Sequence, residues 1–271
     1  MLGNTKLSVL GAGKLGEILI KGLLEAAVID VSNLVVTAGH QPRLDYLRER
    51  FGVSGTLSNQ NAVEYADVVL LGVKPQTVPV VLADIGSLLR PSQILISVAA
   101  SVSTAFIEKH LASPVPVIRA MPNTPCLLKK GMTGLSAGSN ATQEHVELAR
   151  FIFDSVGRTV VVDEKHMDAI TGLSASGPAF VYIIIESLAE AGVKVGLPRD
   201  LATELAAQTV LGAGTMVLET AEHPAKLKDT VTTPAGCTID GILELEEGGL
   251  RVTLIKAVVK ATERAKQLLE T

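Results

Sequence analysis

The stretch from Lys228 to Gly249 combines hydroxyl groups, a proline and small residues in a pattern that could hold an anion. Thr233 directly precedes Pro234, and the tetrapeptide Ala-Gly-Cys-Thr follows. Proline favours the first turn of a helix because the amide hydrogen that it lacks would have no partner there, and a hydroxyl just before it is a common N-cap. The pattern therefore predicts a helix that begins at Pro234.

The first amides of such a helix have no partner within it, and the helix dipole adds positive charge at the same end. Anions therefore bind at helix N-termini. Here the amides belong to Gly236, Cys237 and Thr238, and the hydroxyls of Thr232 and Thr233 lie next to them in sequence. A small anionic substrate is one interpretation, and an ordinary capped helix is the other.

The beginning of the chain carries a glycine-rich turn with the spacing of dinucleotide-binding sites. An apolar segment at residues 6–10 leads into Gly-Ala-Gly-Lys-Leu-Gly, and a helical pattern follows. In this strand–turn–helix context Gly11 would make the tight turn, Gly13 would let a pyrophosphate approach, and Gly16 would let the helix pack on the strand. We therefore predict a coenzyme site here.

The residues after the second predicted strand, 33–37, indicate which coenzyme is bound. NAD enzymes usually place an acid there to bond the ribose hydroxyls. No acid is present, and Thr37, His40 and Arg43 could instead hold a 2′-phosphate. NADP is therefore expected, with NADPH preferred and NAD as the alternative. The other interpretation is that these three residues are ordinary loop residues.

The first half of the chain alternates between apolar strand-like segments and helical ones. Strands are expected at residues 67–73, 93–99, 116–120, 132–136 and 158–162, between helices at 42–51, 60–66, 76–89 and 141–154. Near-continuous apolar strands are typical of a parallel sheet covered on both faces. The pattern predicts an α/β fold whose N-terminal domain, residues 1–163, is a doubly wound (Rossmann-type) sheet.

Residues 164–271 show helical patterns only, so we predict an all-α C-terminal domain. The helices expected at about 178–195 and 200–219 are apolar around most of their circumference. A helix that is apolar all round lies within a core or against a partner. Because about 100 residues bury too little surface to enclose two such helices, we expect the domain to dimerise.

The composition narrows the classes of partner and compartment. The net charge of −4 argues against nucleic acid and anionic membranes. No uninterrupted apolar stretch nears the ~20 residues that span a bilayer, and two distant cysteines suit a reducing, cytoplasmic compartment. The histidines lack paired spacing, so no metal site is expected.

No Lys–Asp or His–Glu relay stands out in the second half, which disfavours a hydroxyacid dehydrogenase. Hydride addition to a C=N bond fits better. An iminium is already protonated and electrophilic, so the protein need only bind it, orient it and exclude water.

Several motifs together resemble the pyrroline-5-carboxylate reductase family over essentially the whole chain. They are GAGKLG at 11–16, VKP at 73–75, SVAA at 97–100, MPNTP at 121–125, SASGPA at 174–179, GLP at 196–198, EHP at 222–224 and LKDTVTTPAGCTI at 227–239. The last is the most specific. Ala235, where the family usually has glycine, and Cys237, where threonine or alanine is frequent, are mild departures.

The resemblance implies reduction of the cyclic imino acid 1-pyrroline-5-carboxylate to L-proline by NAD(P)H, in a homodimer at least and up to a decamer. It implies Thr238 as the catalytic residue, with its hydroxyl facing the ring nitrogen. The substrate residues that it implies are Val231, Thr232, Thr233, Gly236, Cys237 and Thr238. With the glycine argument, the coenzyme residues are Leu10, Gly11, Ala12, Gly13, Lys14, Leu15, Gly16, Thr37, Ala38, Gly39, Asn59, Gly72, Val73, Lys74, Pro75, Val98, Ala99, Ala100 and Asn123.

Two alternatives stay open from the sequence. One is another imine or enol-acid reductase on the same scaffold. The other is a coenzyme-binding regulator that uses the glycine-rich turn as a sensor, against which the Thr-Thr-Pro stretch at 232–234 argues.

Overall fold

The computed structural model describes residues 2–267. Its contacts divide the chain into two compact units. One unit runs to Ser176 and resumes at Val259, and the other is Gly177–Val258. The predicted boundary after residue 163 separates a coenzyme domain from a helical domain by function, and it stays a prediction.

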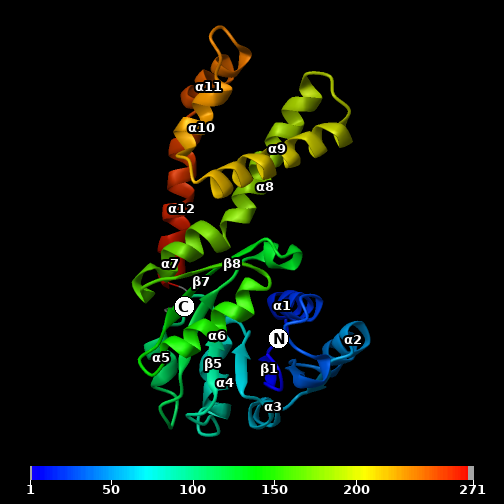
Figure 1. The fold of residues 1–271 in the computed structure, drawn as a ribbon, viewed down its shortest axis with the longest axis vertical. Helices are drawn as coiled ribbons and strands as arrows, with labels where there is room; N and C mark the ends of the chain where they lie inside the picture. The colour runs from blue at the N-terminus through cyan, green and yellow to red at the C-terminus, as the bar shows by residue number, and fades with distance from the viewer. Residues whose placement is uncertain (1, 268–271) are drawn as a thin grey trace. The chain divides into compact units, whose positions relative to one another are not determined.

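The first unit is built on one eight-stranded sheet, with the order β3-β2-β1-β4-β5-β6-β7-β8 (Figure 1). β7 is antiparallel to β6, and the other neighbouring pairs are parallel. The strands are β1 (Leu7–Leu10), β2 (Leu34–Thr37), β3 (Ser54–Thr56), β4 (Val68–Leu71), β5 (Ile94–Ser97), β6 (Val117–Met121), β7 (Gly131–Ala137) and β8 (Gly157–Val161). The predicted doubly wound sheet is confirmed, because β2 and β3 lie on one side of β1 whereas β4 and the later strands lie on the other.

Helices cover both faces of the sheet because alternate strand residues point to opposite faces. In β4, Val68 and Leu70 join the core beneath one group of helices, whereas Val69 and Leu71 join the other core. The first group is α1 (Lys14–Glu25), α2 (Gln41–Phe51) and α6 (Gln143–Asp154). The second is α3 (Asn59–Tyr65), α4 (Val78–Ile85) and α5 (Thr104–Glu108). The aliphatic pattern of the strands thus explains two cores of aliphatic residues.

The second unit is helical, as predicted. It contains α8 (Gly177–Lys194), α9 (Arg199–Thr220), α10 (Pro224–Val231), α11 (Cys237–Glu247) and the first part of α12 (Leu250–Gln267). The remaining part of α12 belongs to the first unit, where the Ser101 hydroxyl donates a hydrogen bond to the carbonyl of Ala265.

The helix expected at about 178–195 is α8, which begins at Gly177. Other helical segments lead into it, namely η4 (Glu164–His166), α7 (Met167–Ile170) and the π-helical turn η5 (Thr171–Ala175), with a bend at Ser176 between η5 and α8. The Ser176 amide donates to the carbonyl of Thr171 at 3.0 Å, the five-residue step of a π-helix. Such a local adjustment lets a helix accommodate a proline that lacks its own amide hydrogen.

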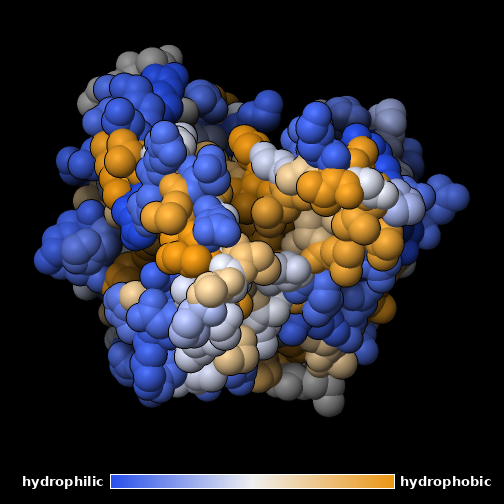
Figure 2. Space-filling view, turned by 90° about the horizontal axis from the view of Figure 1, so that it is seen from above, coloured by the Kyte–Doolittle hydropathy of each residue, from blue (hydrophilic) through white to orange (hydrophobic). Residues whose placement is uncertain are grey.

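α8 and α9 pack closely against each other but leave much apolar surface uncovered. A Cβ added to Gly192 would lie 2.9 Å from that of Ala202, so glycine permits the approach. Few side chains of this unit are buried, and large apolar ones such as Ile183 are 62% exposed. Figure 2 shows hydrophobic residues gathered in patches on the surface seen from above.

Two helices correct the expectation about membrane-spanning segments. Glu164–Lys194 and Arg199–Thr220 are each long and apolar enough to span a membrane by length and composition alone. Core helices of soluble proteins meet the same criterion, and here only a small part of each helix is buried within the single chain. Each helix carries a few charged residues that interrupt its apolar run, and the expectation from the sequence considered only uninterrupted runs.

Candidate coenzyme and substrate sites

A pocket of about 490 Å³ lies at the carboxyl ends of β1, β2 and β4. In a doubly wound sheet ligands bind at this edge, where the strand order reverses. The lining residues are Gly11, Ala12, Gly13, Lys14, Ala38, Gly39, His40, Arg43, Gly72, Val73, Lys74 and Thr77. Nine of them are among the predicted coenzyme residues. Thr77 was missed by sequence reasoning, although it falls one turn after Lys74-Pro75.

The glycines of the turn have different tasks. Gly11 has a φ of +77°, and a Cβ there would lie 2.3 Å from Cγ1 of Val73, so only glycine fits. A Cβ on Gly13 would meet no atom closer than the Gly11 carbonyl at 4.0 Å, so its open side is available to a ligand. Two lysines, Lys14 and Lys74, line the same pocket. These features fit the pyrophosphate of a dinucleotide.

Thr37 supports the glycine turn from within the protein. Its side chain is buried, and its hydroxyl accepts from the Gly11 amide at 3.0 Å and donates to Oδ1 of Asn59 at 2.7 Å. A hydroxyl has one hydrogen to donate. Thr37 and Asn59 therefore shape the turn, and the hydroxyl of Thr37 presents no donor to the pocket, contrary to the suggested contact with a 2′-phosphate.

The predicted residues after β5 and β6 lie outside the lining of this pocket. Val98 and Ala99 are buried, and Ala100 is half-buried. Asn123 is held at both ends of its amide, because Oδ1 accepts from the Met132 amide at 2.9 Å and Nδ2 donates to the Ser174 carbonyl at 3.0 Å. The other predicted coenzyme residues outside the lining are Leu10, Leu15, Gly16, Thr37, Asn59 and Pro75.

The Thr-Thr-Pro stretch forms a turn between α10 and α11, and the helix starts later than predicted. The N-cap is Gly236 and the first helical residue is Cys237. Pro234 lies in the turn, Ala235 has a φ of +58°, and the Gly236 amide donates to the Thr233 carbonyl at 3.0 Å. The capping pattern misplaced the start because the left-handed residue at 235 reverses the chain before the helix can begin.

This correction changes which amides are open. The Gly236 amide is bonded within the turn, so the first free amides of α11 are those of Cys237, Thr238 and Ile239. No side chain caps this helix end. The sequence prediction missed Ile239 because it placed the helix start too early. Three unpaired amides in the first turn are the arrangement that binds a carboxylate.

The side chains around the turn differ in how available they are. The Thr232 hydroxyl donates to the Lys228 carbonyl at 3.0 Å, so its hydrogen is used within α10. The hydroxyl of Thr238 makes no hydrogen bond within residues 2–267. Val231 is exposed and lines an apolar cavity of about 330 Å³ between α9 and α10. Thr233 and Thr238 are therefore the hydroxyls of this stretch with an uncommitted hydrogen, and of the two only Thr238 lies in the first turn of α11.

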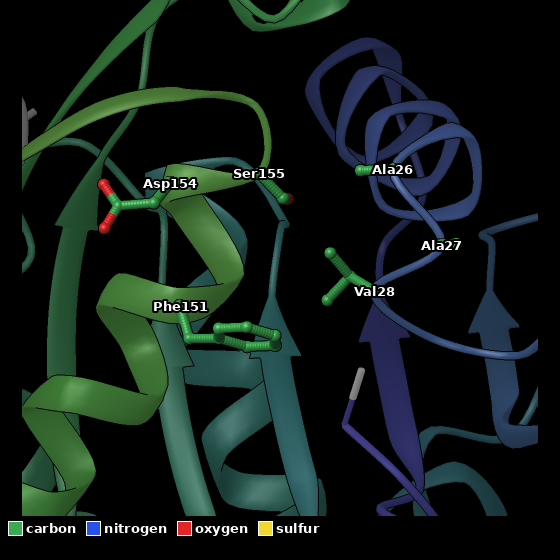
Figure 3. Close-up of a pocket in the computed structure, with 6 residues that line it drawn as sticks. All are labelled: Ala26, Ala27, Val28, Phe151, Asp154 and Ser155. Carbon is green, nitrogen blue, oxygen red and sulfur yellow. The ribbon is translucent and has the colours of Figure 1, made fainter.

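Another opening in the first unit, of about 380 Å³, lacks side chains suited to bind a dinucleotide or a small anion (Figure 3). Phe151 of α6 and Val28 point toward one another across it, while the carboxylate of Asp154 points away. That carboxylate accepts a hydrogen bond from Thr159 at 2.6 Å. The rest of the lining is Ala26, Ala27 and Ser155.

Cys126 and the acidic side chains of residues 2–267 add no further candidate site. Burial raises the pKa of the Cys126 thiol, which keeps it protonated. Within residues 2–267, no group of three or more histidine, cysteine, aspartate and glutamate side chains could hold a metal ion.

The fold and the glycine-lined pocket define a dinucleotide-binding oxidoreductase. A model of the NADP oxidoreductase, coenzyme F420-dependent family matches residues 6–101, and the pyrroline-5-carboxylate reductase dimerisation model matches residues 164–268. Together with the relatives below, these matches show that the chain belongs to the pyrroline-5-carboxylate reductase family.

Relatives match over nearly their whole length. The pyrroline-5-carboxylate reductase of Methanosarcina acetivorans is 42% identical over 98% of both chains, and that of Glycine max is 43% identical over 97% of this chain and 95% of its own. The solved reductase of Coxiella burnetii is 37% identical, with a TM-score of 0.90, over 99% of this chain and 100% of that one. The Plasmodium falciparum enzyme, solved with NADP bound, is 32% identical, with a TM-score of 0.89, over 98% of each.

Proposed function

We propose that this protein reduces the C=N bond of 1-pyrroline-5-carboxylate to give L-proline, with NADPH as the preferred coenzyme and NADH as the alternative. The observation that carries the substrate assignment is the uncapped first turn of α11, with free amides at Cys237, Thr238 and Ile239. It offers a carboxylate site in a chain whose other unit has a dinucleotide pocket.

The chain's residues divide the work as follows. The open side of Gly13 and the cations Lys14 and Lys74 hold the pyrophosphate, and the coenzyme supplies the hydride. The amides of α11 hold the substrate carboxylate and thereby orient the ring. Thr238 presents its uncommitted hydroxyl to the ring nitrogen, which supports its assignment as the catalytic residue.

The remaining predicted residues act around these contacts. Thr37, Asn59 and Asn123 hold loops in place through the hydrogen bonds described above. The substrate set remains Val231, Thr232, Thr233, Gly236, Cys237 and Thr238, with Gly236 needed for the turn because a Cβ there would lie 2.5 Å from Oγ1 of Thr233.

We also propose that residues 1–163 form the coenzyme domain and that residues 164–271 form the substrate and dimerisation domain, which associates at least into a homodimer and up to a decamer. The exposed apolar side chains of α8 and α9 support association, because surfaces of this kind are normally covered by a partner. The unpacked glycines Gly212 and Gly214 would allow a second copy to approach closely. A partner of this kind accounts for both apolar helices without a membrane. The two distant cysteines support a cytoplasmic protein, and the net charge of −4 supports one that binds no nucleic acid.

The test is to follow NADPH oxidation with 1-pyrroline-5-carboxylate and to identify the product as L-proline by mass spectrometry. The uncarboxylated ring, 1-pyrroline, serves as the matched comparison, and it should be reduced far more slowly because it lacks the group that α11 binds. Absence of turnover with 1-pyrroline-5-carboxylate would overturn the proposal. Faster turnover of another imine or of an enol acid would reassign the substrate on the same scaffold.

A further inference from the structure

Arg43 is the cation at the end of the coenzyme pocket that follows β2. It lines the pocket with Ala38, Gly39 and His40, and no acid follows the strand. The position is fixed by the start of α2, because Nδ1 of His40 accepts from the Arg43 amide at 3.3 Å as the N-cap. This is the side chain best placed to meet a phosphate on the ribose.

The guanidinium of Arg43 is already engaged by the protein. Its Nε donates to the Ala12 carbonyl at 2.9 Å, and its Nη2 donates to the Gly13 carbonyl at 3.1 Å. The same Nη2 lies 2.6 Å from Oε2 of Glu17, in the first turn of α1. Only 23% of the Arg43 side chain and 19% of the Glu17 side chain are exposed, so water screens this ion pair weakly.

Glu17 is charged and held in place from other directions. Its Oε1 accepts from the Tyr46 hydroxyl at 3.0 Å and pairs with Nη1 of Arg50 at 2.9 Å. Burial alone would raise the pKa of the Glu17 carboxyl, but hydrogen bonds from Arg43 and Tyr46 and the charges of Arg43 and Arg50 outweigh it and lower that pKa. At neutral pH a full negative charge therefore sits against the phosphate-binding cation.

We infer that Glu17 is a specificity-determining residue that limits the preference for NADPH over NADH. A ribose 2′-phosphate carries about −1.5 to −2 charges at neutral pH and must share the guanidinium with the Glu17 carboxylate. NADH has no such group, so the same carboxylate weakens NADH binding much less. Specificity is such a difference between two affinities. The inference rests on the NADP-type coenzyme use proposed above.

The test uses equilibrium binding of adenosine halves, which needs no substrate and no turnover. Isothermal titration with adenosine 2′,5′-bisphosphate and with ADP reports the 2′-phosphate contact and the pyrophosphate contact separately. Glu17→Gln should tighten the bisphosphate about 10-fold, the value of roughly one released charge-assisted hydrogen bond, and should change ADP less than about 2-fold. In an Arg43→Gln background the same substitution should have no effect on either probe.

Two matched variants separate this effect from simpler ones. Asp45→Asn removes one negative charge from α2, where Asp45 pairs with Arg48, and should leave the ratio of the two affinities unchanged. Arg50→Gln removes the other cation of Glu17 and should not tighten the bisphosphate. Thermal melts of each variant control for folding.

An unchanged affinity ratio in a folded Glu17→Gln protein would overturn the inference and would make Arg43 only a clamp on the Ala12 and Gly13 carbonyls. Equal tightening of both probes would overturn it too, because it would indicate a general charge effect. Failure of the proposed reaction shows up differently, as lack of proline formation with normal binding of both probes.

Discussion

The guanidinium of Arg119 lies 2.9 Å from the carboxylate of Asp168 and joins the middle of β6 to helix α7. Arg119 is only 4% exposed, and its Nη1 also lies 3.4 Å from Oε1 of Glu164. Glu164 in turn accepts hydrogen bonds from the amide and the hydroxyl of Thr104, at 2.7 and 2.6 Å. One buried cation thus ties the start of the long helix to the sheet and to α5.

We expect Arg119→Met to destabilise the protein by about 3 kcal/mol, because two partly buried carboxylates lose their counter-ion. Urea unfolding monitored by circular dichroism measures this change in the free energy of unfolding. The control is Lys165→Met, which removes an exposed pair with Asp163 and should change stability by less than about 1 kcal/mol. Equal effects of the two substitutions would contradict the structural role of the Arg119 cluster.

Thr238→Ala should lower kcat/KM by about 10- to 1,000-fold, the loss expected for one or two charge-assisted hydrogen bonds at a substrate-positioning site. Thr220→Ala is the comparison, because that hydroxyl is committed at the end of α9, where it donates to the Met216 carbonyl and accepts from the Glu222 amide. Steady-state kinetics with varied 1-pyrroline-5-carboxylate give both values. Activity of Thr238→Ala within a factor of two of wild type would remove Thr238 from the catalytic role.

Gly39→Asp should shift coenzyme preference toward NADH, because a carboxylate there repels a 2′-phosphate and can bond the ribose hydroxyls. The structure favours this position over Ala38, since a Cβ on Gly39 meets no atom within 4 Å whereas Ala38 is buried. The ratio of kcat/KM values for NADPH and NADH measures the shift. A wild-type protein that binds NADH more tightly than NADPH would contradict this account of the turn.

Ile183→Glu should dissociate the protein. In the single chain Ile183 is 62% exposed, so a charge there should cost little, whereas an unpaired charge inside a subunit interface costs several kcal/mol. Sedimentation velocity at micromolar concentration measures the change. Glu204→Gln, on the already charged surface of α9, is the control and should keep the assembly. A monomeric wild type would disprove the proposed dimer.

Acid should erase the contribution of Glu17 to stability. Because the pKa of Glu17 is lowered in the folded protein, its carboxylate stabilises the fold above about pH 4.5, and this stabilisation disappears as the pH falls through the lowered value. The difference in Tm between wild type and Glu17→Gln should therefore shrink from pH 7 to pH 3. A difference that is the same at both pH values would show that Glu17 acts through packing alone.

Local chemistry made several features of this protein predictable from its sequence. The Gly11 turn is one, because a position with φ of +77° and no room for a Cβ tolerates only glycine. The central strands are another, since aliphatic runs such as Val68–Leu71 are buried on both faces of a parallel sheet. The motif at 227–239 also marked the family, which the comparisons confirmed.

Tertiary structure decided what depends on residues far apart in the chain. The start of α11 was decided locally but only the backbone shows it, because the left-handed Ala235 moved the start to Cys237 and exchanged the Gly236 amide for that of Ile239. The pairing of Arg119 with Asp168 and the hold of Glu17 on Arg43 join separate elements, so no spacing in the sequence could reveal them. Sequence periodicity records which face of an element is apolar, whereas contacts between charged side chains form only after the sheet has brought its strands and helices together.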